Sequence, residues 1–440
     1  MICGRPVTLG SSDVIPLPSA IEEKDVLFVD YDGTVLYSYT AEEFLAMDQF
    51  PQNPTHDGLI AQGWNWSFSG ARSYVAECGK LMVGQVYTTS DGETKVYIHL
   101  REGRTSPYLG LAIDGTVEVD WGDGSQKDTM SGTALSGGGI ADIISTQHEY
   151  AGIGDYVISI KSVSGQFAIR GTLGSGSTYY SHLLWKNNTS KSTENNCYRD
   201  AVQKVHIGDG CVIGQYGFFG MRGLAAVTIP NGITMQSQSM AFDACYSLKS
   251  IVIPENCVIP QYCFYGCYAL SKAVLPENCT GIGENAFRDC RSIRRISLPA
   301  NINSLSTYVF YCCLTLESVT IPSRMSVLGY GAFYCTSIRE ITLPTSMTDI
   351  TNELFNFCAD LTEITIPENV TSMTSMSFNN CTGLRRIIFK STTPPTVSAS
   401  GGWLKLPTDC ELVVPAGCLS AYTSAANYPS SSVYTYVEES

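Results

Sequence analysis

The chain has 440 residues, of which 44% are hydrophobic and 15% charged. This composition is typical of packed domains and excludes a disordered chain, and no apolar run approaches the roughly 18 residues of a membrane span. Residues 1–160 hold 22 acidic and 8 basic side chains, so the net charge of −14 belongs to the first third. Because phosphate groups are bound by Lys and Arg, the acidic front excludes nucleic acid as an expected partner, and membrane insertion is not expected either.

Residues 1–94 are interpreted as a small N-terminal α+β segment. Its first 25 residues lack the basic start and the apolar stretch of a secretory signal, so no signal peptide is visible in this sequence. This segment resembles the front ends of leucine-rich repeat proteins from gut bacteria and their phages. That resemblance implies no known chemistry.

An Asp pair follows the first apolar stretch of this segment, in DVLFVDYDGTVL. Asp30 and Asp32 form a D-x-D-G-T motif that resembles the first motif of haloacid-dehalogenase-type phosphatases, which implies a nucleophile, an acid/base and a magnesium ion. The segment is too short for the α/β domain of those enzymes. We therefore expect no catalytic residues here, and instead a hairpin leading into a helix at 40–47 with Thr40 and Glu43 as its capping box.

Short alternating strands are predicted between residues 95 and 171. VDWGDGS at 119–125 and HEYAGIGDYVISI at 148–160 resemble the two characteristic stretches of PKD-type immunoglobulin-like domains. The resemblance implies a β-sandwich that acts as a spacer or binding module. Asp120 and Asp123 could ligate calcium, but the preferred interpretation is side-chain bonds to the backbone of the turn.

A repeat of about 23 residues runs from 201 to 390 and shows three markers in register. Apolar–Pro pairs occur at 229–230, 253–254, 275–276, 298–299, 321–322, 343–344 and 366–367. The second marker consists of Phe219, Phe242, Phe264, Phe287, Phe310, Phe333, Phe355 and Phe378. The third consists of Cys245, Cys267, Cys290, Cys313, Cys335, Cys358 and Cys381.

Aligned on cysteine, each unit reads C-x-x-[LI]-x-x-[IAV]-x-[ILV]-P, as in CYSLKSIVIP from Cys245. The alternating residues predict a short strand that Pro ends, and a short turn or helix carrying Phe follows. Because a single unit can bury little apolar surface by itself, neighbouring units are expected to stack into a parallel ladder of strands with a continuous core. Residues 172–200 are expected to be a linker and N-terminal cap, and residues 391–440 a C-terminal cap with a strand and a helix near 411–422.

The units resemble the BspA-type, treponemal-like leucine-rich repeats of bacterial surface proteins, whose pattern includes A-F-x-x-C. AFDAC at 241–245, AFRDC at 286–290 and AFYC at 332–335 carry this resemblance. It implies a right-handed leucine-rich repeat solenoid, and it implies that the repeat cysteine faces inward and bonds the neighbouring turn. The expected fold is thus a multidomain chain with the sandwich and the α+β segment in front of the solenoid.

Seventeen cysteines raise the alternatives of disulfides and zinc. Buried free thiols are favoured. The seven repeat cysteines are expected at equivalent, evenly spaced positions, so pairing them into disulfides would break that uniformity and leave one cysteine unpaired. Cys263 with Cys267 and Cys312 with Cys313 are the nearest approach to zinc-ligand pairs, but no His stands near them. We therefore expect no metal and no cofactor.

Function is expected on the outward face of the repeat strands, where the fifth and seventh residues after each cysteine point away from the core. The candidate binding residues are Lys272, Arg295, Thr320, Glu340, Thr342, Glu363, Thr365 and Arg386. The expected partner is a protein or glycan on a host or bacterial surface. The alternative is a solvated face that binds nothing.

The first functional hypothesis is a non-enzymatic adhesion or interaction protein, located outside the cell or on its surface. A phage virion or tail-associated structural protein is the alternative, and a phosphatase is third. The ligand, the bacterial or phage origin and the oligomeric state stay open at this point.

Overall fold

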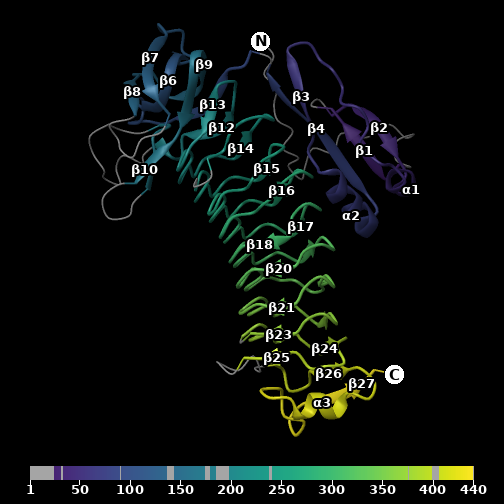
Figure 1. Ribbon diagram of the computed structural model, residues 1–440. Helices are drawn as coiled ribbons and strands as arrows, with labels where there is room; N and C mark the ends of the chain where they lie inside the picture. Colours follow the sequence, from purple (N-terminus) through teal and green to yellow (C-terminus); the bar gives the residue numbers. More distant parts are fainter. Residues whose placement is uncertain are drawn as a thin grey trace.

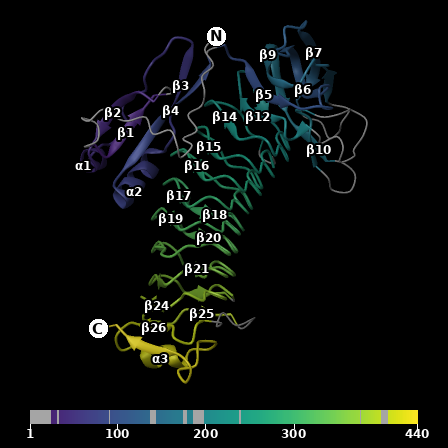
Figure 2. The same ribbon diagram turned by 180° about the vertical axis from the view of Figure 1, so that it is seen from behind.

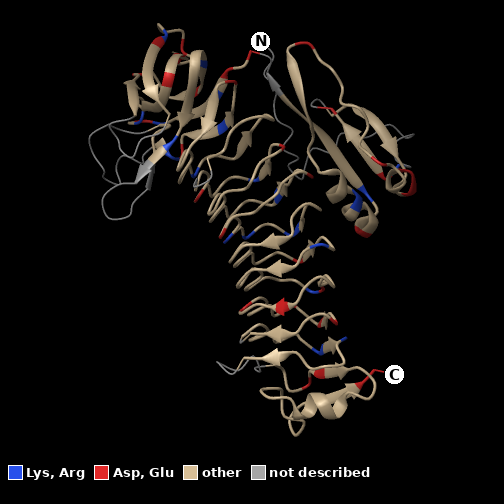
Figure 3. Ribbon diagram, in the orientation of Figure 1, with Lys and Arg blue, Asp and Glu red and all other residues tan. Residues whose placement is uncertain are grey.

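A long stack of coils carries two β-rich domains at one end and a cap at the other (Figures 1 and 2). The computed structural model describes residues 24–30, 33–89, 91–135, 143–173, 179–184, 198–236, 240–374, 376–398 and 406–439. Each coil corresponds to one repeat of the sequence. Lys, Arg, Asp and Glu occupy few positions along the coils (Figure 3).

The N-terminal domain is a four-stranded sheet with two helices. Its strands are β1 (Val26–Val29), β2 (Val35–Tyr39), β3 (Leu59–Trp64) and β4 (Leu81–Thr89), in the order β2-β1-β4-β3. The expected hairpin is present because β1 pairs antiparallel with β2. The expected helix is α1 (Ala41–Leu45), and the Thr40–Glu43 capping box is formed in both directions.

The second domain is antiparallel and joins the coil sheet directly. It contains β5 (Thr94–Leu100), β6 (Tyr108–Asp120), β7 (Asp128–Ala134), β8 (Ile144–Gln147), β9 (Gly154–Ile169), β10 (Gly171–Leu173) and β11 (Tyr179–Ser181). Strand β5 pairs antiparallel with β12 (Val202–His206) of the first coil, and β9 pairs parallel with β13 (Cys211–Ile213). The second domain therefore covers the first coil. Of the expected linker and cap at 172–200, residues 174–178 and 185–197 lie outside the described residues.

The repeat strands stack in parallel, as the sequence predicts. They are β14 (Ala226–Thr228), β15 (Ser250–Val252), β16 (Lys272–Val274), β17 (Arg295–Ser297), β19 (Ser318–Thr320), β22 (Glu363–Ile366) and β24 (Arg386–Phe389). A second column of short strands consists of β18 (Ser304–Leu305), β20 (Val327–Leu328), β21 (Asp349–Ile350), β23 (Ser372–Met373) and β25 (Thr396–Val397). Strand order and hydrogen bonding thus give a parallel β-solenoid with little helix.

Turns replace helices in the second half of the described coils, and each turn is built around a Phe. Residues two before and two after this Phe have positive φ in coil after coil, as in Tyr308 and Cys312 around Phe310, both at 56°. Non-glycine residues rarely adopt this region, so its repetition shows that packing between coils holds the turn conformation.

The Phe side chains form a continuous stack inside the solenoid, here called the Phe ladder. Neighbouring rings lie 5.0–5.9 Å apart between centroids and within 15° of parallel, and all are fully buried. The first member of the ladder is Phe218. The sequence spacing predicts Phe219 at this position, and that prediction is wrong. Phe219 instead lies beneath the guanidinium of Arg199, 5.7 Å from its ring centroid.

Six of the seven marker cysteines occupy the predicted inward position. Each donates its thiol to the carbonyl of the Phe in the preceding coil, at 3.0–3.1 Å. The assignment of Cys335 to this position is wrong. Thr336 is the buried residue there, and its hydroxyl donates to the Phe333 carbonyl at 3.0 Å, whereas Cys335 lies one residue earlier and is half-exposed.

The coil of Cys335 is also one residue shorter between its turn and its strand position. Only Ser337 separates Thr336 from the buried Ile338, where other coils have two residues. Residues 338–343 form no assigned strand, and the Arg339 amide reaches the Glu317 carbonyl only at 3.5 Å. The missing residue therefore interrupts the strand ladder between β19 and β22.

The C-terminal end of the core is closed by the strand and helix expected there. Strand β26 (Glu411–Val414) continues the ladder beside β24, and β27 (Thr435–Glu438) pairs with β26. Helix α3 (Leu419–Ser424) carries Tyr422, which is fully buried and donates its hydroxyl to the Ser391 carbonyl at 2.7 Å.

Candidate interaction surface

The outward side chains of the repeat strands form one continuous surface, here called the strand face. It consists of residues on β14, β15, β16, β17, β19, β22 and β24 together with 340 and 342. Alternation along each strand places every second side chain on this face, because its neighbours are buried in the core.

The N-terminal domain covers the first part of the strand face. Helix α2 (Phe68–Cys78) lies beside β17, and Figures 1 and 2 both show this domain alongside the upper coils. The Lys272 ammonium is 4.2 Å from the centroid of the Trp66 ring, and Arg295 forms an ion pair with Glu77. Two of the eight candidate binding residues are thus already engaged within the chain.

Hydrogen bonds fix the same contact at its edges. The Ser69 amide donates to Glu277 at 2.9 Å, and the Asn231 amide donates to Gln62 at 3.1 Å. The outward Val274 is only 8% exposed. Burial lowers the pKa of Lys272 to about 7, because an ammonium loses hydration beneath the domain.

The remaining candidate residues lie on the uncovered part of the strand face. Thr320, Glu340, Thr342, Glu363 and Arg386 are exposed, and Thr365 is half-exposed. These six side chains thus point away from the core on the uncovered coils.

Charges at the lower end of this surface are paired with one another. Arg386 lies 2.9 Å from Glu363 and 3.5 Å from Glu411, and all three side chains are about 45% exposed. Exposed ion pairs of this kind add little stability, which leaves these groups able to exchange partners.

The covered part of the strand face was not predicted from the sequence. Two features of the sequence do indicate that this part of the face is covered. Val252 and Val274 are apolar in an outward column, and the front segment carries Trp66 close to a helix start. Apolar side chains on an outward face indicate that another surface packs on them.

The two PKD-like stretches of the sequence come together in the second domain. The Tyr150 hydroxyl donates to the Trp121 carbonyl at 3.0 Å, and the His148 ring stacks on Trp121 at 4.7 Å between centroids. Asp120 and Asp123 accept backbone N–H bonds from Gly122 and Ser125. These are the turn bonds preferred above.

Asp123 also pairs with His148, with Oδ2 and Nε2 2.7 Å apart. Burial raises the pKa of Asp123, but the bonds from Ser125 and His148 outweigh burial and lower it to about 2. Within the described residues, no three His, Cys, Asp or Glu side chains are grouped so that they could hold a metal ion.

Asp30 of the phosphatase-like motif is held in the interior of the N-terminal domain. Its side chain is 5% exposed, accepts a hydrogen bond from the Tyr87 hydroxyl at 2.9 Å, and lies 2.6 Å from His56 Nε2. Asp32 lies outside the described residues. The described part of the domain is a four-stranded mixed sheet, which differs from the doubly wound sheet of the haloacid-dehalogenase-type phosphatases that the motif resembles.

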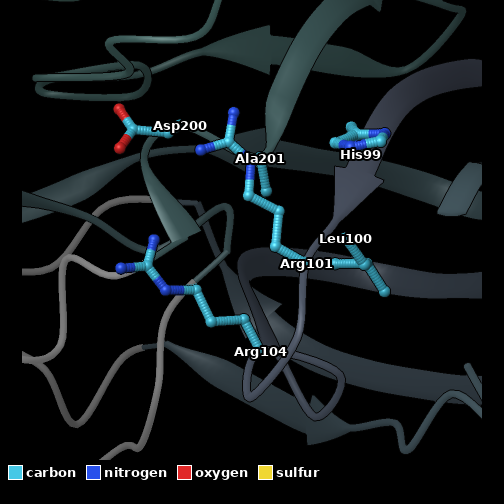
Figure 4. A pocket seen from close by; sticks show the side chains of 6 residues that line it. All are labelled: His99, Leu100, Arg101, Arg104, Asp200 and Ala201. Carbon is cyan, nitrogen blue, oxygen red and sulfur yellow. The ribbon is translucent and has the colours of Figure 1, made fainter. Parts of the chain in front are cut away.

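A small pocket lies where β5 meets the first coil. It is lined by His99, Leu100, Arg101, Arg104, Asp200 and Ala201. Figure 4 shows both Arg side chains extending toward the segment that carries Asp200. His99 is engaged outside the pocket by Asp155, with Nδ1 and Oδ1 2.8 Å apart.

Comparison with known proteins matches the repeats to one family. Residues 191–311 and 258–385 match the family described as BspA type Leucine rich repeat region, in six copies. The search of curated proteins found no match. In the part of the chain that the structure describes, no helix is long and apolar enough to cross a membrane.

Several solved structures resemble the chain. A leucine-rich repeat protein from Bacteroides ovatus is 24% identical, with a TM-score of 0.39, over 48% of this chain and 63% of its own length. A leucine rich cell surface protein from Faecalibacterium prausnitzii is 20% identical, with a TM-score of 0.29, over 56% and 75%. The pneumococcal vaccine antigen PcpA is 14% identical, with a TM-score of 0.31, over 54% and 77%.

The family match and the coil geometry agree on the central part of the chain. The repeat period, the parallel strand ladder and the inward cysteines coincide with residues 201–385 of the matched region. Residues 191–385 are therefore a region of BspA-like leucine-rich repeats, and the part of this region that the structure describes folds as a solenoid.

Proposed function

We propose that the protein is a non-enzymatic adhesion or interaction protein that binds a protein or glycan through the uncovered strand face. The observation that carries this proposal is the division of that face. The N-terminal domain engages Lys272 and Arg295, while Thr320, Glu340 and Thr342 stay exposed on the following coils. Solenoids of this kind offer extended surfaces on which several repeats contact one partner.

The second domain is assigned the role of a PKD-type module within this proposal. It holds the first coil by strand pairing between β5 and β12, so it sets the direction in which the solenoid extends. The contact of Tyr150 with Trp121 supports the relation between the two PKD-like stretches. The same proposal includes a location outside the cell or on its surface, which is supported by the match of the repeats to BspA-type leucine-rich repeats.

A binding screen of the full chain tests the proposal. Arrays of glycans and of gut-surface and bacterial-surface proteins are probed with the wild type and with the double variant Glu340→Lys, Glu363→Lys. Loss of a wild-type signal in the double variant supports the proposal. Glu255→Lys is the matched control, because Glu255 is exposed but lies beyond the end of β15, off the strand face.

Two results would contradict the proposal. Binding that both variants retain would place the contact elsewhere, and the absence of binding by the wild type would favour the solvated-face alternative. Capsid or tail genes next to the gene would favour a virion-associated structural role. Phosphate release that requires Asp30 and magnesium would show enzymatic activity.

A further inference from the structure

Two cysteines in the turns differ from the buried thiols of the solenoid. Among the described cysteines, Cys78, Cys312, Cys335 and Cys418 are not buried. Cys312 and Cys335 follow Phe310 and Phe333 by two residues, so they occupy equivalent positions in adjacent coils. Both have φ of 56°, and the Cys335 thiol is near enough to contribute to the raised pKa of Cys312.

The backbone holds these two positions side by side. The Cys312 amide donates to the Tyr334 carbonyl, and the Cys335 amide donates to the Asn356 carbonyl, each at 2.8 Å. Equivalent residues of adjacent coils are therefore separated by about one strand spacing, ~4.8 Å. That separation lies within the range of about 4.4–6.8 Å between the Cα atoms of disulfide-bonded cysteines.

Rigid neighbours surround the thiol pair. The rings of Tyr311 and Tyr334, the residues that precede the two cysteines, stack at 4.4 Å between centroids. The Arg288 guanidinium lies 4.3 Å from the Tyr311 centroid. Asp289 holds the equivalent position in the preceding coil, and its carboxylate is bound by Arg291 at 2.9 Å. The thiols are therefore held in place by a packed turn surface.

We propose that Cys312 and Cys335 form a reversible dithiol modification site that low-molecular-weight disulfides oxidise to a disulfide between adjacent coils. One cysteine, as thiolate, attacks a sulfur of the small disulfide and releases one thiolate. The second cysteine then attacks the mixed disulfide and releases the other thiolate. The two protein protons end on the two released thiols, so the small disulfide is reduced and the cysteines are oxidised.

The pair of Cys312 and Cys335 lies beside the coil in which the ladder of repeat strands is interrupted. The new bond would join the coil of β19 to the short coil, in which residues 338–343 form no assigned strand. Because the Arg339 amide is 3.5 Å from the Glu317 carbonyl, the strand side contributes little to holding these coils together. Oxidation would therefore stiffen the solenoid at its interrupted interface.

The electrostatics of the pair set the conditions of the reaction. Burial and the neighbouring Cys335 raise the pKa of Cys312 to about 12. Since only the thiolate attacks, the reaction is slow at neutral pH and accelerates as the pH rises.

The test treats the full native chain with oxidised glutathione, alkylates the remaining thiols and digests it with trypsin. Cleavage after Arg324 separates the two cysteines into peptides 296–324 and 325–339. The expected product is these peptides joined, with two hydrogens fewer than the reduced pair. Glutathione attached separately to both cysteines would overturn the proposal.

Single variants identify which two cysteines form the disulfide bond. Cys312→Ser and Cys335→Ser should each abolish the joined peptide and leave a glutathione adduct on the remaining cysteine. Cys418→Ser, which removes another half-exposed thiol, should retain the joined peptide. A joined peptide that persists in Cys312→Ser would assign the bond to Cys313 and overturn the proposal. Since the wild-type product is measured directly, the test does not depend on the variants folding.

Amide exchange provides the second measurement. The oxidised wild type should exchange more slowly at residues 338–343 than the reduced protein, and exchange in the distant β26 should not change. Equal exchange at 338–343 in both forms would contradict the stiffening of this interface.

Discussion

The Lys272 ammonium lies 4.2 Å from the centroid of the Trp66 ring, and this contact joins the N-terminal domain to the third repeat strand of the solenoid. A cation over an aromatic face contributes roughly 0.5–2 kcal/mol, which offsets only part of the desolvation that lowers the pKa of Lys272. Because of this contact, the N-terminal domain covers the first part of the strand face and leaves the rest of that face uncovered.

Trp66→Ala should release the N-terminal domain from the strand face. The change removes both the cation contact and apolar burial, so docking should weaken by about 2 kcal/mol. Amide exchange at β16 and β17 should then become faster. Met82→Ala, a truncation of an exposed residue of the same domain, is the control and should leave exchange at these strands unchanged.

Docking should also depend on pH through Lys272. The pKa of Lys272 is lowered to about 7 in the docked state, so between pH 7 and its ordinary value the undocked state binds more protons. Docking should therefore strengthen as the pH rises from 7 to 10 and be weakest below 7. Lys272→Met should flatten this dependence. A wild-type exchange profile at β16 with no pH dependence, after correction for intrinsic exchange, would contradict the assignment.

His182 should make the second domain sensitive to acid. It is fully buried, and burial together with Arg170 lowers its pKa to about 4. The unfolded state binds more protons between pH 4 and 6.5, so stability should fall as the pH drops through this window, by up to about 3 kcal/mol. Denaturant midpoints of the wild type and His182→Gln check this. His99→Gln, at a site whose side chain is 46% exposed, is the control and should keep the wild-type slope.

The Phe ladder should carry much of the stability of the solenoid. Phe287→Ala removes a fully buried ring from the middle of the stack and should cost about 3–5 kcal/mol. Phe357→Ala truncates a ring that is 45% exposed and should cost less than about 1 kcal/mol. Urea unfolding followed by circular dichroism compares the two, and similar losses would contradict the role of the ladder.

The buried thiols should act as core side chains with a weak hydrogen bond. Cys290→Ala leaves a cavity and removes the bond to the Phe264 carbonyl, so the expected cost is about 1–3 kcal/mol. Cys418→Ala, at a half-exposed thiol of the cap, should change stability by less than about 0.5 kcal/mol. Thermal unfolding in the presence of reductant measures both.

The repeat register was predictable where every unit has the same length. Inward Cys and Phe positions follow from spacing alone for units such as 242–253. At the first unit and at the short unit this prediction failed for Phe219 and Cys335, because spacing alone cannot locate the extra residue between Phe218 and Phe242 or the residue that is missing after Thr336. The buried position is decided by which side chain reaches the neighbouring coil: the Thr336 hydroxyl lies 3.3 Å from the Cys358 sulfur, and the Phe218 ring stacks on Phe242.

By itself, the sequence determined the solenoid, the capping box of α1, the hairpin at Asp30 and the outward orientation of the residues from Thr320 onward, because each depends on local periodicity or a short-range turn. Only the tertiary structure decided that the N-terminal domain covers Lys272 and Arg295, that β5 closes the first coil, and that Cys312 meets Cys335. These contacts join segments that are distant along the chain or depend on the exact register between coils. No local pattern encodes such a pairing, because it follows from which surfaces remain to be buried once the coils have stacked.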